Sequence, residues 1–164
     1  MSNISEKLIE KVKKIKMFIM DVDGTLTDGK IYLGNDGEEF KAFNVKDGLG
    51  INLLRKNGII PVLITGRKSE IVRIRAGELG IKEVYQGIKD KFEVYNKLKE
   101  KYDLKDEEVS YIGDDLNDLN IMKEVGVSFT VNDGADILKK NCDYCSSKDG
   151  GNGAVREIID LILF

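Results

Sequence analysis

The chain has 164 residues, a length that suits one domain with a hydrophobic core of its own. Hydrophobic residues make up 41% and charged residues 34%, and the net charge of −3 argues against nucleic acid or an acidic membrane surface as main partner. No apolar run approaches the roughly 20 residues that span a bilayer, and residues 1–16 lack the apolar centre of a signal peptide, so we expect a cytoplasmic protein.

Apolar periodicity predicts alternating helices and strands in the first half of the chain. The predicted elements are a helix over 5–14, a strand over 17–20, a β-hairpin over 31–44, a helix over 47–56 and a strand over 59–64. Asp47 is predicted to cap the start of its helix. Pro61 indicates that the last of these strands lies at a sheet edge, or else that the proline marks the start of the strand.

The alternation continues in the second half. The predicted elements are helices over 69–79, 89–102, 116–125, 135–140 and 154–163, and strands over 84–85, 109–112 and 127–131. Most strands are unbroken apolar runs, as in strands that are covered on both faces. We therefore expect an α/β fold, a three-layer Rossmann-like parallel sheet with helices on both faces, in a single domain over 1–164.

Polar residues directly follow three of the predicted strands. In open parallel sheets, ligands bind beyond the carboxyl ends of the strands, so these residues are candidates for chemistry. They are Asp21 and Asp23 after the first strand, Thr65, Gly66 and Arg67 after the strand over 59–64, and Asp114 and Asp115 after the strand over 109–112. Three such endings together indicate one site for a phosphate group and a metal ion.

The sequence Asp-Val-Asp-Gly-Thr at 21–25 is the most informative of these endings. Two carboxylates so close together repel each other, and burial penalises each of them further. A nearby cation or a chemical role usually accounts for such a pair. A solvated turn or a calcium loop is the alternative, but the polar endings of the other strands argue against it.

The absence of histidine restricts the chemistry, because it excludes histidine bases, catalytic triads with histidine and histidine metal ligands. Cys142 and Cys145 form a lone Cys-x-x-Cys pair, and no further cysteine or histidine is present to complete a zinc site. We expect both cysteines to serve packing, with redox chemistry as the alternative.

Four motifs occur in the order that is typical of the haloacid dehalogenase-like phosphatase superfamily. They are D-V-D-G-T at 21–25, I-T-G-R at 64–67, D-K at 90–91 and G-D-D-L-N-D at 113–118. Three finer features, at 28–51, 85–91 and 150–157, resemble the 3-deoxy-D-manno-octulosonate 8-phosphate phosphatase family. This resemblance implies a nearly cap-less, Mg²⁺-dependent homotetramer that hydrolyses a phosphosugar in lipopolysaccharide biosynthesis.

The resemblance also implies roles for the acidic residues. Asp21 would be the nucleophile that forms an aspartyl-phosphate, and Asp23 would be the general acid and base. The Asp21 carboxylate, the Asp23 backbone carbonyl and Asp114 would hold Mg²⁺. Asp115 and Asp118 would orient the metal ligands or the catalytic lysine; alternatively, they are acidic residues that only favour a helix N-terminus.

Phosphate contacts follow from the same resemblance. The Thr65 hydroxyl and the Gly66 amide would bind the phosphoryl group. Lys91 would steady Asp21 and the phosphoryl oxygens, with Lys89 as an alternative on spacing alone. Each charged contact of this kind is worth roughly 2 to 4 kcal/mol in a transition state.

The substrate's sugar acid would be bound by other residues. The candidates are Asn44, Val45, Lys46, Asp47 and Gly48 in a loop, Asn52, at a position where relatives often carry a basic residue, and Arg67 and Arg75, which could bind the carboxylate or another subunit. The hairpin flap at about 30–43 would pair with other subunits. The segment at about 150–164 would be a tail that reaches a neighbour's active site, or an ordinary lead-in to a helix followed by that helix.

Three other functions fit parts of the pattern. One is a phosphatase of a nine-carbon ulosonate 9-phosphate or of another phosphosugar. A second is a non-catalytic regulatory module, although Asp21, Asp23, Lys91 and Asp114 are all present. A third is a receiver domain, which would lack the D-x-D-G-T sequence.

Overall fold

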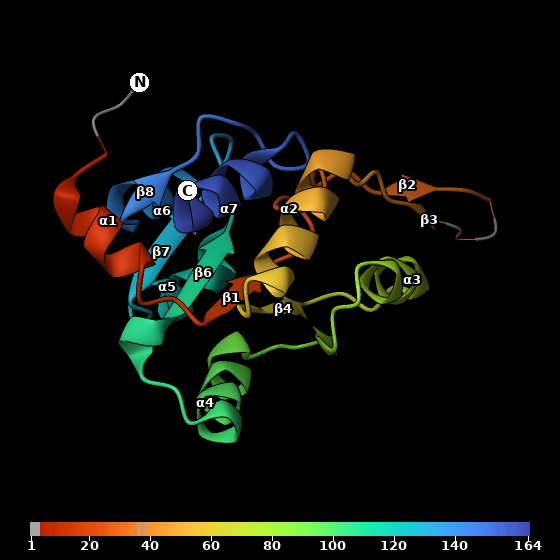
Figure 1. The fold of residues 1–164 in the computed structure, drawn as a ribbon. Coiled ribbons are helices and arrows are strands. Elements are labelled where there is room, and N and C mark those ends of the chain that lie inside the picture. Colours follow the sequence, from red (N-terminus) through yellow and green to blue (C-terminus); the bar gives the residue numbers. More distant parts are fainter. Residues whose placement is uncertain (1–3, 36, 38) are drawn as a thin grey trace.

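The computed structural model describes residues 4–35, 37 and 39–164. One parallel sheet contains β1 (Met17–Met20), β4 (Ile60–Thr65), β5 (Glu83–Gln86), β6 (Val109–Gly113), β7 (Val127–Thr130) and β8 (Tyr144–Cys145). Its strand order is β5-β4-β1-β6-β7-β8. Two further strands, β2 (Tyr32–Leu33) and β3 (Glu39–Phe40), form an antiparallel hairpin that projects from the rest of the molecule (Figure 1). The predicted α/β fold with a small hairpin flap is confirmed.

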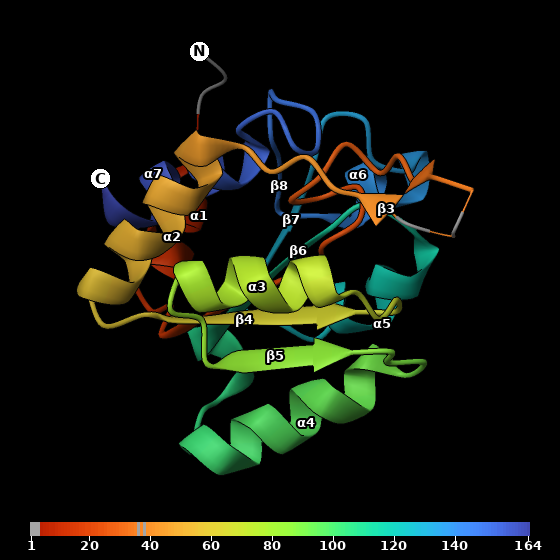
Figure 2. The same ribbon diagram turned by 90° about the vertical axis from the view of Figure 1, so that its right-hand side faces the viewer.

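Helices cover both faces of the sheet. One face packs against α1 (Glu6–Val12), α2 (Val45–Lys56), α3 (Glu70–Glu78) and α7 (Ala154–Leu163). The other packs against α4 (Lys91–Tyr102), α5 (Leu119–Met122) and α6 (Asp136–Asn141). Figure 2 shows α2 and α3 on one side of β4 and β5, and α4 on the other.

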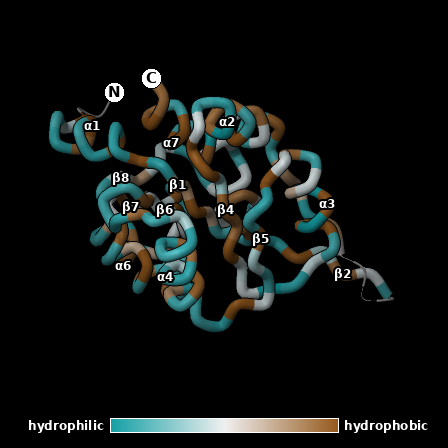
Figure 3. Tube along the Cα trace, turned by 60° about the horizontal axis from the view of Figure 1, so that its bottom comes forward, coloured by the Kyte–Doolittle hydropathy of each residue, from teal (hydrophilic) through white to brown (hydrophobic). Residues whose placement is uncertain are grey.

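The unbroken apolar runs of the strands follow from this two-sided cover. Successive side chains of a strand point to opposite faces, so β1 gives Phe18 and Met20 to one core and Met17 and Ile19 to the other. Figure 3 accordingly shows β1 and β4 mostly in brown, the colour of hydrophobic residues. Two short 3₁₀ helices, η1 (Asp106–Glu108) and η2 (Leu116–Asp118), precede β6 and α5.

Strand register brings three strand ends together. Met20, the last residue of β1, pairs with Leu63 of β4 on one side and with Ile112 of β6 on the other. The backbone N–H of Asp21 then donates to the Ile112 carbonyl over 3.0 Å. The residues that follow β1, β4 and β6 therefore meet at one edge of the sheet.

Some predicted boundaries are wrong. Helix α2 starts at Val45 rather than Asp47, because the Asn44 side chain caps it by accepting the Lys46 N–H over 2.8 Å. The predicted helix over 116–125 is broken into η2 and the four-residue α5. Strand β4 is internal to the sheet, so Pro61 marks the start of a strand and not an edge.

The predicted hairpin is also too long. Its ladder contains only Tyr32–Leu33 and Glu39–Phe40, and residues 36 and 38 of the predicted tip lie outside the described residues. Within the part of the chain that the structure describes, no helix has the length and apolar character to cross a membrane.

Candidate active site

Asp21 and Lys91 form the buried centre of the site. Asp21 follows β1 and is 5% exposed, and Lys91 is the first residue of α4, whose start is capped by Asp90. The Lys91 ammonium donates to Asp21 Oδ1 over 2.8 Å and to Asp118 Oδ1 over 2.6 Å. Lys89 is exposed, so it is Lys91 that the fold directs to Asp21.

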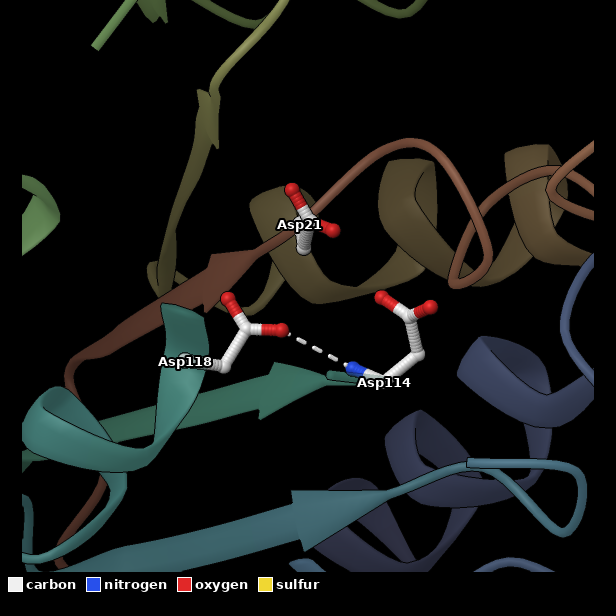
Figure 4. Close-up of side chains that lie close together, drawn as sticks. All are labelled: Asp21, Asp114 and Asp118. Atoms are coloured by element: carbon white, nitrogen blue, oxygen red, sulfur yellow. Dashed lines mark hydrogen bonds between the residues drawn. The ribbon is translucent and has the colours of Figure 1, made fainter. Parts of the chain in front are cut away.

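Asp118 is fully buried and its oxygens are already occupied. Oδ1 accepts from the Lys91 ammonium and from the Tyr111 hydroxyl over 2.5 Å, while Oδ2 accepts the N–H groups of Asp114 over 2.9 Å and Asp115 over 3.2 Å. Figure 4 shows the bond to the Asp114 backbone. These bonds leave little capacity for an ion, so Asp118 orients Lys91 and the 114–115 turn.

The carboxylates at the centre of the site repel one another strongly. Asp21, Asp114 and Asp118 each offer an oxygen, and the three oxygens lie within 4.8 Å of one another. Burial, together with the Asp118 charge, raises the pKa of Asp21 to about 6 although Lys91 opposes this shift. Burial, together with Asp21, raises the pKa of Asp114 to about 8. A divalent cation between Asp21 and Asp114 would remove this conflict.

Gly24 leaves room for the Asp114 carboxylate. Its φ of +88° lies in the region that favours glycine, and a Cβ built on it would lie 2.0 Å from Asp114 Oδ2. The D-x-D-G-T turn is thus packed directly against the second acidic strand end. Carboxylate and carbonyl oxygens of this kind suit a hard cation such as Mg²⁺.

An open depression lies over these groups. It is lined by Asp21, Asp23, Thr65, Gly66, Arg67, Asp114, Asp115 and Asn117. The structure therefore brings together the three strand ends that the sequence singled out. Asp115 also caps η2 by accepting the Leu116 N–H over 2.8 Å.

Of the residues predicted to bind the sugar acid, Arg67 lines this depression and the others do not. Asn44, Asp47, Gly48 and Arg75 instead line a second, small cavity between α2 and α3. The Arg75 guanidinium lies 5.8 Å from the centre of the Phe43 ring, and a Cβ on Gly48 would lie 2.5 Å from an Arg75 nitrogen. Val45 is 78% exposed, and Lys46 and Asn52 do not line the depression either. These substrate contacts stay predictions that would need a neighbouring subunit.

Three residues at the site were missed by sequence reasoning. Tyr111 belongs to an apolar strand run, and its hydroxyl also lies 3.3 Å from the Lys91 ammonium. Asn117 lines the depression from η2. Lys41, in the hairpin segment, forms an ion pair with Asp23. Lys41 lies in the family-like stretch at 28–51 and Asn117 in the G-D-D-L-N-D motif, but no local pattern indicates that Lys41 meets Asp23.

The glycine-rich segment before α7 packs on the chain's own motif loop. The Gly151 N–H donates to the Thr25 carbonyl over 3.0 Å, and a Cβ on Gly150 would lie 1.9 Å from the Gly24 carbonyl oxygen. Residues 150–153 thus support the D-x-D-G-T turn and lead into α7, and the reach of the segment at about 150–164 to a neighbour's active site stays a prediction.

The two cysteines are free thiols. Burial, with the neighbouring Cys145, raises the pKa of Cys142 to about 11, and burial also raises the pKa of Cys145. A high pKa leaves little thiolate at neutral pH, which favours packing over redox chemistry.

Comparison with known proteins agrees with the geometry. Residues 70–158 match a family model described as haloacid dehalogenase-like hydrolase. The 3-deoxy-D-manno-octulosonate 8-phosphate phosphatase KdsC of Escherichia coli K12 is 46% identical over 160 residues, which cover 98% of this chain and 85% of the relative.

Solved structures show the same relationship. The phosphatase of this name from Yersinia pestis has a TM-score of 0.95 at 45% identity and covers 96% of this chain and 85% of its own. The one from Moraxella catarrhalis, solved with a magnesium ion, a phosphate ion and KDO, has a TM-score of 0.92 at 46% identity, with coverages of 94% and 89%.

Fold, site and matches together define a haloacid dehalogenase-like hydrolase, which excludes the receiver domain. Within that superfamily, the chain belongs to the 3-deoxy-D-manno-octulosonate 8-phosphate phosphatase family.

Proposed function

We propose that the protein hydrolyses 3-deoxy-D-manno-octulosonate 8-phosphate to the free sugar acid and phosphate. The 46% identity to a phosphatase of this name, which extends over 98% of this chain, supports this substrate. A relative solved with magnesium, phosphate and KDO supports the site. Nothing in these matches favours the nine-carbon alternative. The observation that carries the chemistry is the buried contact of Lys91 with Asp21 beside Asp114.

The reaction would proceed in two displacements. An Asp21 oxygen attacks phosphorus, and the bond from phosphorus to the sugar oxygen breaks while Asp23 gives that oxygen a proton. Asp23 then takes a proton from a water molecule that attacks the phosphorus of the aspartyl-phosphate. Phosphate leaves, and the Asp21 carboxylate is restored.

Lys91, Thr65 and Gly66 would hold the phosphoryl group. Burial alone would lower the pKa of Lys91, but the charges of Asp21 and Asp118 outweigh it and raise the pKa. The ammonium therefore stays charged where negative charge gathers in the transition state. Thr65 is 2% exposed at the end of β4 and lines the same depression as Asp21.

Asp21, Asp114 and the Asp23 backbone carbonyl would hold Mg²⁺. The fit rests on oxygen donors, on the raised pKa values of the two carboxyls and on the space that Gly24 leaves for Asp114. When bound, Mg²⁺ would offset the repulsion between the carboxylates and the substrate phosphate.

The homotetramer and the cytoplasmic location stay predictions. Four side chains of the hairpin region are exposed and hydrophobic, namely Ile31, Tyr32, Leu33 and Phe40. Exposed hydrophobic side chains of this kind fit a hairpin that other subunits cover. Light scattering coupled to gel filtration would test the tetramer directly.

Phosphate release from a panel of sugar phosphates, with and without Mg²⁺, tests the proposed function. We expect 3-deoxy-D-manno-octulosonate 8-phosphate to exceed nine-carbon and generic phosphosugars, and the Asp21→Asn variant to be inactive with every substrate. Equal turnover of all phosphosugars would refute the substrate assignment. Mg²⁺-dependent release by Asp21→Asn would refute the nucleophile.

A further inference from the structure

Lys41 is a buried cation that the proposed mechanism does not yet use. It follows β3 at the base of the hairpin, and its side chain is only 2% exposed. A lysine ammonium is rarely buried without a partner of opposite charge. Here the partner is Oδ1 of Asp23, whose side chain is 21% exposed and borders the depression.

The two aspartates of the D-x-D-G-T motif thus have separate cations. Lys91 reaches Asp21 from α4, and Lys41 reaches Asp23 from the hairpin. The two lysines cannot replace each other, because Lys91 is also fixed by Asp118. Lys41 therefore acts on the side chain to which the proton-transfer role is assigned.

We infer that Lys41 is a positioning residue that holds the Asp23 carboxylate toward the leaving oxygen, and that the seating of the hairpin thereby controls proton transfer. This inference rests on the proposed role of Asp23. Lys41 binds Oδ1, which leaves Oδ2 for the transferred proton. Proton transfer depends steeply on such placement, since a misplacement of about 1 Å can lower a rate by roughly 10²-fold.

The hairpin connects Lys41 to the motif loop along the chain. Lys41 is 18 positions from Asp23 in sequence, and β2 and β3 lie between them. The ion pair ties the base of the hairpin to the motif loop, while Leu33 and Phe40 stay 72% and 68% exposed. A partner that covers these apolar side chains would therefore also fix Lys41 and the Asp23 carboxylate.

The test compares two substrates that differ in their need for a general acid. The sugar phosphate leaves as a strongly basic alkoxide unless it is protonated, whereas p-nitrophenyl phosphate releases a weakly basic phenolate. kcat/KM reports the first displacement, in which the leaving group departs. Its ratio for the two substrates, measured on one preparation, does not depend on the fraction of folded enzyme.

We expect Lys41→Met to lower kcat/KM for the sugar phosphate by about 10- to 100-fold and for p-nitrophenyl phosphate by less than about 3-fold. Asp23→Asn should likewise lower kcat/KM far more for the sugar phosphate than for p-nitrophenyl phosphate. Lys41→Arg should restore part of the ratio of the two kcat/KM values. Lys30→Met is the matched control, because Lys30 lies in the same hairpin region, is 72% exposed and pairs with Asp28.

The possible results separate the inferred role of Lys41 from the proposed role of Asp23. Suppose that Lys41→Met lowers kcat/KM equally for both substrates, while Asp23→Asn lowers it mainly for the sugar phosphate. This result would overturn the inference and leave the proposed function intact. The absence of a contrast in Asp23→Asn would overturn the proton-transfer role of Asp23 and the inference with it. If Lys41→Arg, which keeps the positive charge, restored no part of the ratio, the result would argue against positioning by that charge and would overturn the inference.

Discussion

The Lys91 ammonium lies 2.8 Å from Oδ1 of Asp21, and both side chains are almost fully buried. The same ammonium bonds Asp118, so one cation serves two buried carboxylates. This arrangement ties the structure of the strand ends to the reactivity of Asp21. Removal of the ammonium should therefore affect stability and activity together.

In Lys91→Met we expect phosphate release with Mg²⁺ to fall by at least about 10²-fold, because the charge at the phosphoryl group is lost. Unfolding free energy should fall by about 3–5 kcal/mol, since breaking a buried ion pair leaves uncompensated charge. Initial rates and urea unfolding measure the two effects. Lys89→Met, at an exposed position, should stay within about 0.5 kcal/mol of the wild type, and a stable Lys91→Met would contradict the prediction.

Gly24→Ala tests whether the motif turn makes room for the metal ligand. The new Cβ would meet Asp114 Oδ2 at 2.0 Å at a backbone φ of +88°, so Asp114 must move. We expect Mg²⁺ affinity, measured by calorimetry, to weaken by roughly tenfold or more, as when a residue that supports a metal ligand is changed.

Gly58→Ala is the matched control for this variant. Gly58 has a φ of +81° but no atom within 4 Å of the added Cβ, so it carries the strain without the clash. It should lose about 1 kcal/mol of stability and keep its Mg²⁺ affinity. Equal Mg²⁺ binding by both variants would show that contact with Asp114 is unimportant.

The sequence was sufficient to predict the strand-end residues, because each is part of a local pattern. Asp21, Thr65 and Asp114 follow apolar runs, and parallel pairing carries them to the same edge. Family resemblance added the choice of Lys91 over Lys89. The geometry now explains that choice, because the Asp90 cap starts α4 with Lys91 directed at Asp21.

The remaining contacts are not local, and no sequence pattern signals them. Lys41 meets Asp23 across 18 positions, and Asp47 meets the backbone of Arg156 across 109 positions. The break in the predicted helix over 116–125, by contrast, coincides with a local contact. Asp118 turns its carboxylate back onto the N–H groups of Asp114 and Asp115 and so shapes the turn before α5.

Stability should depend on pH through the acidic cluster. The pKa values of Asp21 and Asp114 are raised to about 6 and about 8 in the folded protein, above those of an unfolded chain. Protons bound by the folded state stabilise it at low pH, and that stabilisation is lost as pH rises through these values. In EDTA we therefore expect the melting temperature to fall between about pH 6 and pH 8.

Mg²⁺ should oppose this fall, because it binds the deprotonated carboxylates. Thermal melts at pH 8 should show a rise in melting temperature with Mg²⁺ in the wild type and a much smaller one in Asp114→Asn. Without metal, Asp114→Asn should also lose less stability over the same pH range. A metal-free melting temperature that rises toward pH 8 would contradict the shifted pKa values.

Asp47 provides the last prediction, which separates a structural role from substrate binding. Its carboxylate is 1% exposed and accepts the Arg156 N–H over 2.8 Å at the first turn of α7. Gly153 precedes that helix and has no side chain to cap it, so Asp47 acts as the cap from α2. Burial raises the pKa of Asp47, although the N–H groups of Arg156 and Gly153 oppose this shift.

We expect Asp47→Ala to lower the free energy of unfolding by about 1–2 kcal/mol, as for the loss of a helix cap. Asp47→Asn keeps an oxygen acceptor and should lose less. Because Asp47 is buried, KM for the sugar phosphate should change in neither variant. A raised KM at unchanged stability would show instead that Asp47 contacts the substrate, as the family resemblance implies, and that α7 does not need its cap.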